Sequence, residues 1–168
     1  MYLALGAALL IALAWAAPPC RAAEADERVT NPQFLPSEGG QLPAGWSVWQ
    51  PEWVGAGCVV QSVAGGLRMD APGKPYAVGG VTQELKGIRG GQAYAVRADC
   101  ELVGVPFPPR SALVRLEWTR GGRALHPAGA LVRGPLVEGN RARFDDTLVA
   151  PADADGARLW LEVKWLLG

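Results

Sequence analysis

The chain has 168 residues, the length of one ordinary domain with a core large enough to fold without disulfides or metal ions. Charged residues make up 19% of the sequence and the formal net charge is zero, which argues against both a nucleic-acid-binding surface and an acidic disordered tail. The 22 glycines and 14 prolines follow no collagen-like period and favour many short strands joined by turns. We therefore expect a single domain and no nucleic-acid partner.

Residues 1–25 are typical of a secretory signal peptide, although no Lys or Arg precedes their apolar run from Leu3 to Ala17. Small residues fit cleavage after Ala25, with cleavage after Ala22 as a second choice. The run is shorter than the about 20 apolar residues of a spanning helix, so a signal is favoured over a membrane anchor. The sequence thus predicts a secreted or periplasmic domain over 26–168, without membrane contact after cleavage.

Export would place Cys58 and Cys100 in an oxidising compartment, where a disulfide between them is one interpretation. Their sequence separation does not establish that their Cα atoms approach within about 7 Å. Two buried thiols are an equally good interpretation, because free cysteine is among the most buried residue types.

The mature chain begins with a turn-rich segment that predicts an irregular N-terminal arm over about 26–45, anchored by Phe34 and Leu35. Two short runs at 58–63 and 66–71 follow, separated by an Ala-Gly-Gly turn. This pattern predicts a β-hairpin.

Three tryptophans lie within eight positions of the segment AGWSVWQPEWVGAG, residues 44–57. Alternation along a short strand places Trp46 in the core and Trp49 on the opposite face. A proline then interrupts the alternation and leaves Trp53 in a loop. Trp49 and Trp53 are therefore candidates for stacking against a ligand.

The remaining strands are predicted from apolar residues at every second position. The runs lie at 77–85, 91–102, 111–123, 141–149 and 157–167. In the second run, the apolar set is Tyr94, Val96, Ala98 and Cys100, and in the third it is Ala112, Val114, Leu116 and Trp118. A helix beginning at Ser111 is the competing interpretation, but alternation fits the third run better.

The last run places Ala157, Leu159, Leu161, Val163 and Trp165 inward, and it places Arg158, Trp160, Glu162 and Lys164 outward. Many short strands without a helix or a βαβ rhythm predict an all-β fold, an antiparallel β-sandwich of the jelly-roll type. The glycine pairs starting at residues 65, 79, 90 and 121 are expected in turns between strands, so they form no phosphate cradle.

Few residues suggest catalysis or metal binding. The single histidine, His126, lies in a Gly/Pro-flanked loop, and the cysteines lack a zinc-ligand spacing. Asp145-Asp146 and the Asp153-x-Asp155 turn match only fragments of a calcium loop, so structural calcium is unsupported and we predict no cofactor.

Glu117 and Glu162 raise glycoside hydrolysis as an option, but cross-strand ion pairs such as Arg115 with Glu162 are the favoured interpretation. We therefore predict a protein that is not an enzyme. The same polar face carries Trp160, and sugars stack their C–H faces on exposed rings while Arg and carboxylates bind their hydroxyls. Trp160, Arg115, Glu117 and Glu162 thus join Trp49 and Trp53 as candidate ligand-binding residues. A Trp160 covered by another segment or protein is an equally weighted alternative.

The order of the motifs NPQF, PAGW, GGLRM, VTQEL, GIRGGQAYAVRA, LVRLEW and VAPADADGARLWLEV resembles galactose-binding-like jelly rolls that serve as carbohydrate-binding modules. GWSVWQPEW and PPRSALVRLEW are similar to an accessory domain that precedes the catalytic domain in exported carbon-nitrogen hydrolase (nitrilase-like) proteins. The Glu, Lys and Cys triad of those catalytic domains has no counterpart in the context of Cys58 or Cys100. The resemblance implies a non-catalytic carbohydrate-binding module, accessory to a hydrolase domain or partner protein. A structural or protein-docking domain without a sugar ligand is the alternative.

Overall fold

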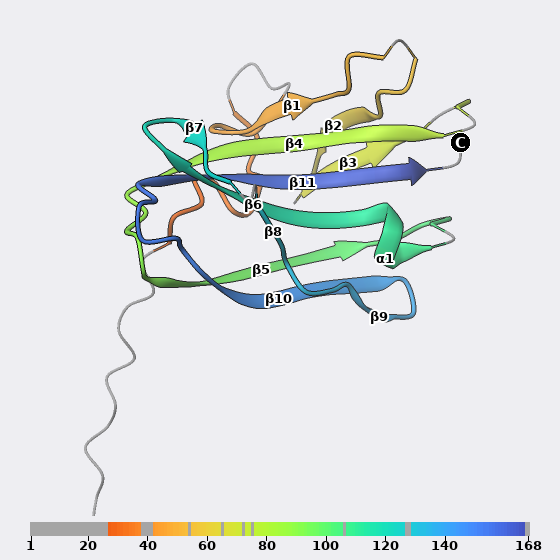
Figure 1. Ribbon diagram of the computed structural model, residues 1–168. Coiled ribbons are helices and arrows are strands. Elements are labelled where there is room, and N and C mark those ends of the chain that lie inside the picture. Colours follow the sequence, from red (N-terminus) through yellow and green to blue (C-terminus); the bar gives the residue numbers. More distant parts are fainter. Residues whose placement is uncertain are drawn as a thin grey trace, which may run out of the picture.

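The computed structural model describes residues 27–37, 42–53, 55–64, 66–71, 73–74, 76–105, 107–126 and 129–166. Within them the chain is an antiparallel all-β sandwich, as the alternating runs predicted (Figure 1). No helix in these ranges has the length and apolar character needed to cross a membrane. The predicted signal peptide lies outside the described residues.

A six-stranded sheet, called the large sheet below, forms one layer. Its strands in spatial order are β1 (Ser47–Trp49), β4 (Ala77–Lys86), β11 (Gly156–Leu166), β6 (Ala112–Arg120) and β7 (Arg123–Ala124), and β8 (Ala130–Leu131) also pairs with β6. Figure 1 shows β1, β4, β11 and β6 side by side. The first strand is therefore paired with β4 from the middle of the chain, and the C-terminal strand β11 lies on the other side of β4.

The other strands form a three-stranded sheet, the small sheet, and a separate hairpin. The small sheet has the order β5 (Ala93–Glu101), β10 (Arg141–Val149) and β9 (Leu136–Glu138), and the hairpin joins β2 (Val59–Val63) to β3 (Gly66–Asp70). One helical turn, α1 (Pro108–Ser111), ends where β6 begins. The hairpin prediction and the choice of strand over helix after Ser111 are both confirmed.

The core consists of the apolar faces of these strands. Val81, Leu116, Phe144 and Trp46 are buried in the main cluster, so the assignment of Trp46 to the core is confirmed. A smaller cluster contains Cys58, Ala71, Ala77 and Leu166. The inward sets predicted for β5 and β6 contact or belong to the main cluster.

Cys58 and Cys100 are both free thiols, which favours the buried-thiol interpretation over a disulfide. Cys58 belongs to the smaller cluster and Cys100 packs against the main one. Burial raises the pKa of both thiols.

Three details differ from the sequence predictions. Trp165 is exposed rather than inward, because a β-bulge between Lys164 and Leu166 interrupts the alternation. Leu35 is exposed, so of the two predicted anchors Phe34 alone packs on the core, with its ring centroid 4.9 Å from that of Trp46. The glycine pair beginning at Gly79 lies inside β4 and not in a turn.

Candidate functional site on the outer face of the large sheet

Five of the six candidate ligand-binding residues lie on the outer face of the large sheet. Trp160 on β11 stands opposite Thr82 on β4 and Arg115 on β6, and Trp49 on β1 stands opposite Gly80. Strand alternation places Glu117 and Glu162 on this same face. The outer-face cluster, as named here, consists of Trp49, Glu84, Arg115, Glu117, Arg158, Trp160, Glu162 and Lys164.

Trp160 is the centre of this cluster, and it is covered. The edge of Trp49 meets its ring at a centroid distance of 5.4 Å and an interplanar angle of 81°. The guanidinium carbon of Arg115 lies 4.4 Å from the centroid of the Trp160 ring, a cation–π geometry. Only 9% of Trp160 is exposed, so the expectation of an open stacking platform at this residue is wrong.

Ion pairs connect the strands around the Trp160 ring. Arg115 Nη2 lies 2.8 Å from Glu162 Oε1, which confirms the cross-strand pair predicted from the sequence. Arg158 holds two carboxylates, Glu117 at 3.1 Å and Glu84 at 2.5 Å. These ion pairs hold the charged groups of the cluster in defined positions.

Two buried polar atoms in the cluster lack hydrogen-bond partners. One is the indole Nε1 of Trp160, and the other is Oε2 of Glu162, which has only Lys164 Nζ at 3.5 Å as an ion-pair neighbour. An unsatisfied buried polar group costs roughly 1–3 kcal/mol, so such groups are uncommon in folded proteins and call for an explanation. A buried donor and a buried acceptor without hydrogen-bond partners therefore belong to two residues on the same face of β11.

Gly80 lets the strands approach closely under the cluster. A Cβ atom at this position would collide with the carbonyl oxygen of Leu161 on the adjacent β11. Trp49 on β1 and Glu162 on β11 both stand opposite Gly80 in the register, on either side of β4.

The structure does not join Trp53 to this cluster. Trp53 follows β1 in a loop, is 54% exposed, and takes part in none of the ring contacts among the described residues. A different pair, Tyr76 and Trp165, is exposed with ring centroids 6.1 Å apart. Sequence reasoning missed this pair because alternation assigned Trp165 to the interior.

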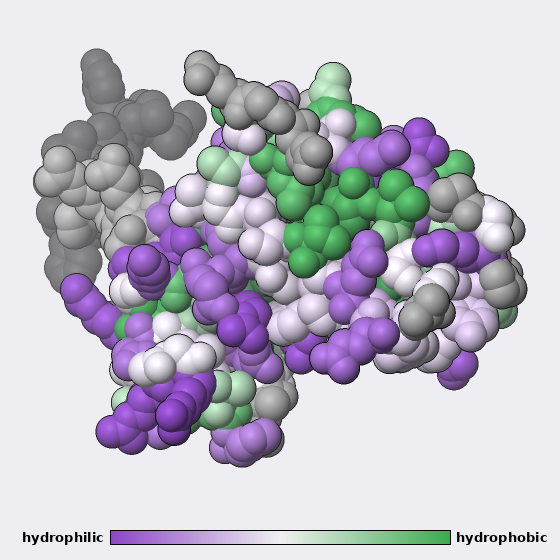
Figure 2. Space-filling model, turned by 90° about the horizontal axis from the view of Figure 1, so that it is seen from above, coloured by the Kyte–Doolittle hydropathy of each residue, from purple (hydrophilic) through white to green (hydrophobic). Residues whose placement is uncertain are grey.

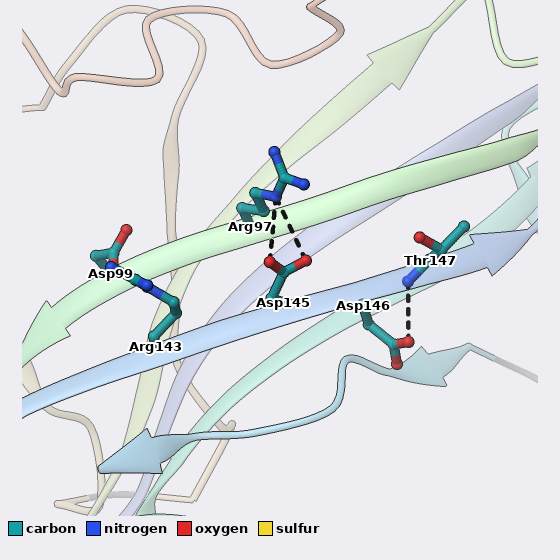
Figure 3. A network of polar contacts seen from close by, with 6 residues as sticks. All are labelled: Arg97, Asp99, Arg143, Asp145, Asp146 and Thr147. Atoms are coloured by element: carbon teal, nitrogen blue, oxygen red, sulfur yellow. Dashed lines mark hydrogen bonds and ion pairs between the residues drawn. The ribbon is translucent and has the colours of Figure 1, made fainter. Parts of the chain in front are cut away.

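The acidic residues considered as calcium ligands are engaged elsewhere. On the outer face of the small sheet, Asp145 faces Arg97 and Asp99 faces Arg143 across β5 and β10 (Figure 3). Backbone N–H groups of Arg133 and Thr147 donate to the Asp146 carboxylate and lower its pKa.

Asp155 accepts hydrogen bonds from the backbone N–H of Gly121. No group of three His, Cys, Asp or Glu side chains within the described ranges is placed to hold a metal ion. His126 is exposed in its loop.

Comparisons with known proteins add support for the fold. No protein-family model matches the chain, and no curated protein matches it. A solved structure that is similar is the enzymatically active domain of tailspike protein 4 from bacteriophage CBA120, with a TM-score of 0.51 and 12% sequence identity. The likeness covers 74% of this chain and 18% of that chain, and at this identity it concerns the fold alone.

Proposed function

We propose that this chain is an exported, non-catalytic binding module whose ligand is a carbohydrate that contacts the outer face of the large sheet. One observation carries the proposal: aromatic rings, guanidinium groups and carboxylates from β1, β6 and β11 converge on one face, where a buried N–H donor and a buried carboxylate oxygen lack partners. Sugar hydroxyls both donate and accept hydrogen bonds, and their C–H faces pack on aromatic rings. Carbohydrate therefore matches both parts of this surface.

Access to the Trp160 N–H requires a side chain to move. Arg115 keeps 27% of its side chain exposed, and Trp49 belongs to an edge strand of three residues and is only partly buried. These two groups are the ones that a ligand would displace or join. Trp49 offers the more accessible ring of the pair.

The carboxylates of the cluster support binding rather than catalysis. Glu117 and Glu162 are each held by an arginine from a neighbouring strand, an arrangement that fixes them as acceptors for ligand hydroxyls. We assign neither of them a catalytic role. The predicted signal peptide over residues 1–25 supports a secreted or periplasmic location.

The test is affinity gel electrophoresis of the purified chain in gels containing xylan, galactomannan or hydroxyethylcellulose, with tryptophan-fluorescence titration and a glycan array. We expect at least one polymer to retard the wild type, and Trp49→Ala to weaken binding roughly tenfold, about 1.4 kcal/mol. Leu136→Ala, an exposed residue of the small sheet, is the control and should bind as the wild type does. A wild type that binds no glycan, or a Trp49→Ala variant that binds normally, would refute the proposal.

Protein docking is the second candidate function, and two observations favour it. The ring of Trp160 is closed to stacking, and Trp and Arg are the residue types enriched at interface hot spots. In addition, Figure 2 shows hydrophobic residues gathered on the face seen from above.

Docking predicts a stoichiometric complex with a purified hydrolase domain in analytical ultracentrifugation. The complex should disappear in the Trp49→Ala variant, and no polysaccharide should retard the chain.

A further inference from the structure

Trp165 has an unusual backbone conformation for an aromatic residue. Its φ angle is 58°, in the left-handed region that bulky residues rarely adopt. Lys164 pairs with Val78 and Leu166 with Ala77, so Trp165 is the extra residue of a β-bulge. Leu166 stays buried in the smaller cluster, whereas Trp165 is 54% exposed. The bulge therefore turns a large apolar ring toward water at a cost in backbone energy.

The exposed ring has an aromatic neighbour, Tyr76. Tyr76 is 46% exposed, and the two rings are tilted by 57° with centroids 6.1 Å apart. Ala77, the next residue, is fully buried in the smaller cluster, so alternation along the chain places Tyr76 on the side of Val78 and Gly80. That side is the outer face, and Trp165 joins it through this ring contact.

The two aromatic pairs are separated along the strands. Trp49 stands opposite Gly80, which is four residues from Tyr76, so at about 3.3 Å per residue Trp49 and Tyr76 are about 13 Å apart along the strand direction. Charged groups lie between them, because Glu162 stands opposite Gly80 and Lys164 opposite Val78. Two charged residues of β11 thus lie between the two aromatic pairs along the strand direction.

We infer that this face is an extended track for a polysaccharide chain, with Trp49 at one end and the Tyr76–Trp165 pair at the other. The inference rests on the proposed function and specifies its ligand as a polymer rather than a single sugar. One sugar ring would occupy only one aromatic pair, whereas a chain lying along β4 and β11 contacts both pairs and Lys164 between them, whose side chain is 35% exposed. A strained residue that only stabilised the fold would be expected to bury its ring, and Trp165 does not.

The variants Trp165→Gly and Tyr76→Ala test the inference, with Leu136→Ala as the control. Glycine adopts the left-handed conformation without a steric cost, so Trp165→Gly should unfold at a temperature no lower than the wild type. Titration calorimetry would use oligosaccharides from disaccharide to hexasaccharide, prepared from whichever of xylan, galactomannan or hydroxyethylcellulose retards the wild type. We expect wild-type affinity to rise with chain length. Each variant should bind the hexasaccharide roughly tenfold more weakly and the disaccharide unchanged.

The possible results separate the two proposals. If both variants bind the hexasaccharide as tightly as the wild type, the track is refuted while the binding function stands. A wild-type affinity that does not increase with chain length also refutes the track. If Trp165→Gly fails to fold, Tyr76→Ala decides the question alone. A wild type that binds none of the three polymers overturns the proposed function itself.

Discussion

Replacing Arg115 by methionine tests whether the outer-face cluster is a tightly coupled unit. Methionine keeps an apolar stem over Trp160 but removes the guanidinium. Glu162, whose side chain is 1% exposed, then loses its partner at 2.8 Å, which we estimate to cost about 2 kcal/mol with Lys164 still nearby. Loss of the cation–π contact at 4.4 Å adds about 1 kcal/mol. The expected decrease in the free energy of unfolding is therefore about 3 kcal/mol.

Urea denaturation followed by circular dichroism measures this change without relying on Trp160 fluorescence. The matched control is Arg97→Met, because Arg97 pairs with Asp145 across strands of the small sheet with side chains 73% and 48% exposed. Such a pair contributes less than about 1 kcal/mol. In the double variant Arg115→Met/Glu162→Gln, removal of the stranded charge should recover part of the loss. An Arg115→Met variant within about 0.5 kcal/mol of the wild type, or one no worse than Arg97→Met, would refute the reasoning.

Three further predictions concern other parts of the chain. Gly80→Ala should lower the free energy of unfolding by about 2 kcal/mol through overpacking against β11, whereas Gly66→Ala, with open space around it, should not; equal urea midpoints for the two variants would contradict this. Alkylation under non-reducing, denaturing conditions should label both Cys58 and Cys100. A disulfide-linked peptide in the mass spectrum would contradict the prediction that both residues are free thiols. The folded-state pKa of Asp146 is below its ordinary value of 3.8. The ionised carboxylate therefore stabilises the fold at pH values above 3.8, and this contribution is lost as the pH falls through the folded-state pKa. The stability difference between wild type and Asp146→Asn should therefore be present near neutral pH and shrink in acid; a difference independent of pH would exclude this role.

Most strands could be predicted because each one carries its own pattern of burial. In β5 the set that includes Tyr94 and Val96 packs on the core, while Arg97 and Asp99 face water, so local alternation contains the needed information. The same argument placed Arg115 and Glu162 on one face before their contact was known. Alternation of apolar and polar residues is therefore enough to predict the strands of a sheet that has one face in the core and the other in solvent.

The sequence does not predict burial correctly where residues distant in the chain determine which side chains are covered. The charged neighbours of Trp160 on its own strand left an open and a covered ring as equally weighted interpretations, and Trp49, over a hundred positions earlier, covers the ring. Trp165 was assigned inward because one inserted residue in a bulge reverses the alternation without any change in composition. The pairing of β1 with β4 and the bulge in β11 are properties of the assembled sheet, which no single segment encodes.

β5 forms one edge of the small sheet and, at nine residues, is long enough to serve as a template for another chain. Its outward residues Arg97 and Asp99 form ion pairs with Asp145 and Arg143 of β10 (Figure 3). The side-chain amide of Asn140, just before β10, donates a hydrogen bond to Glu101. A second β-strand approaching this edge would have to match that order of charges or place like charges together. We therefore expect this ladder of charges to disfavour pairing of a second chain along the β5 edge.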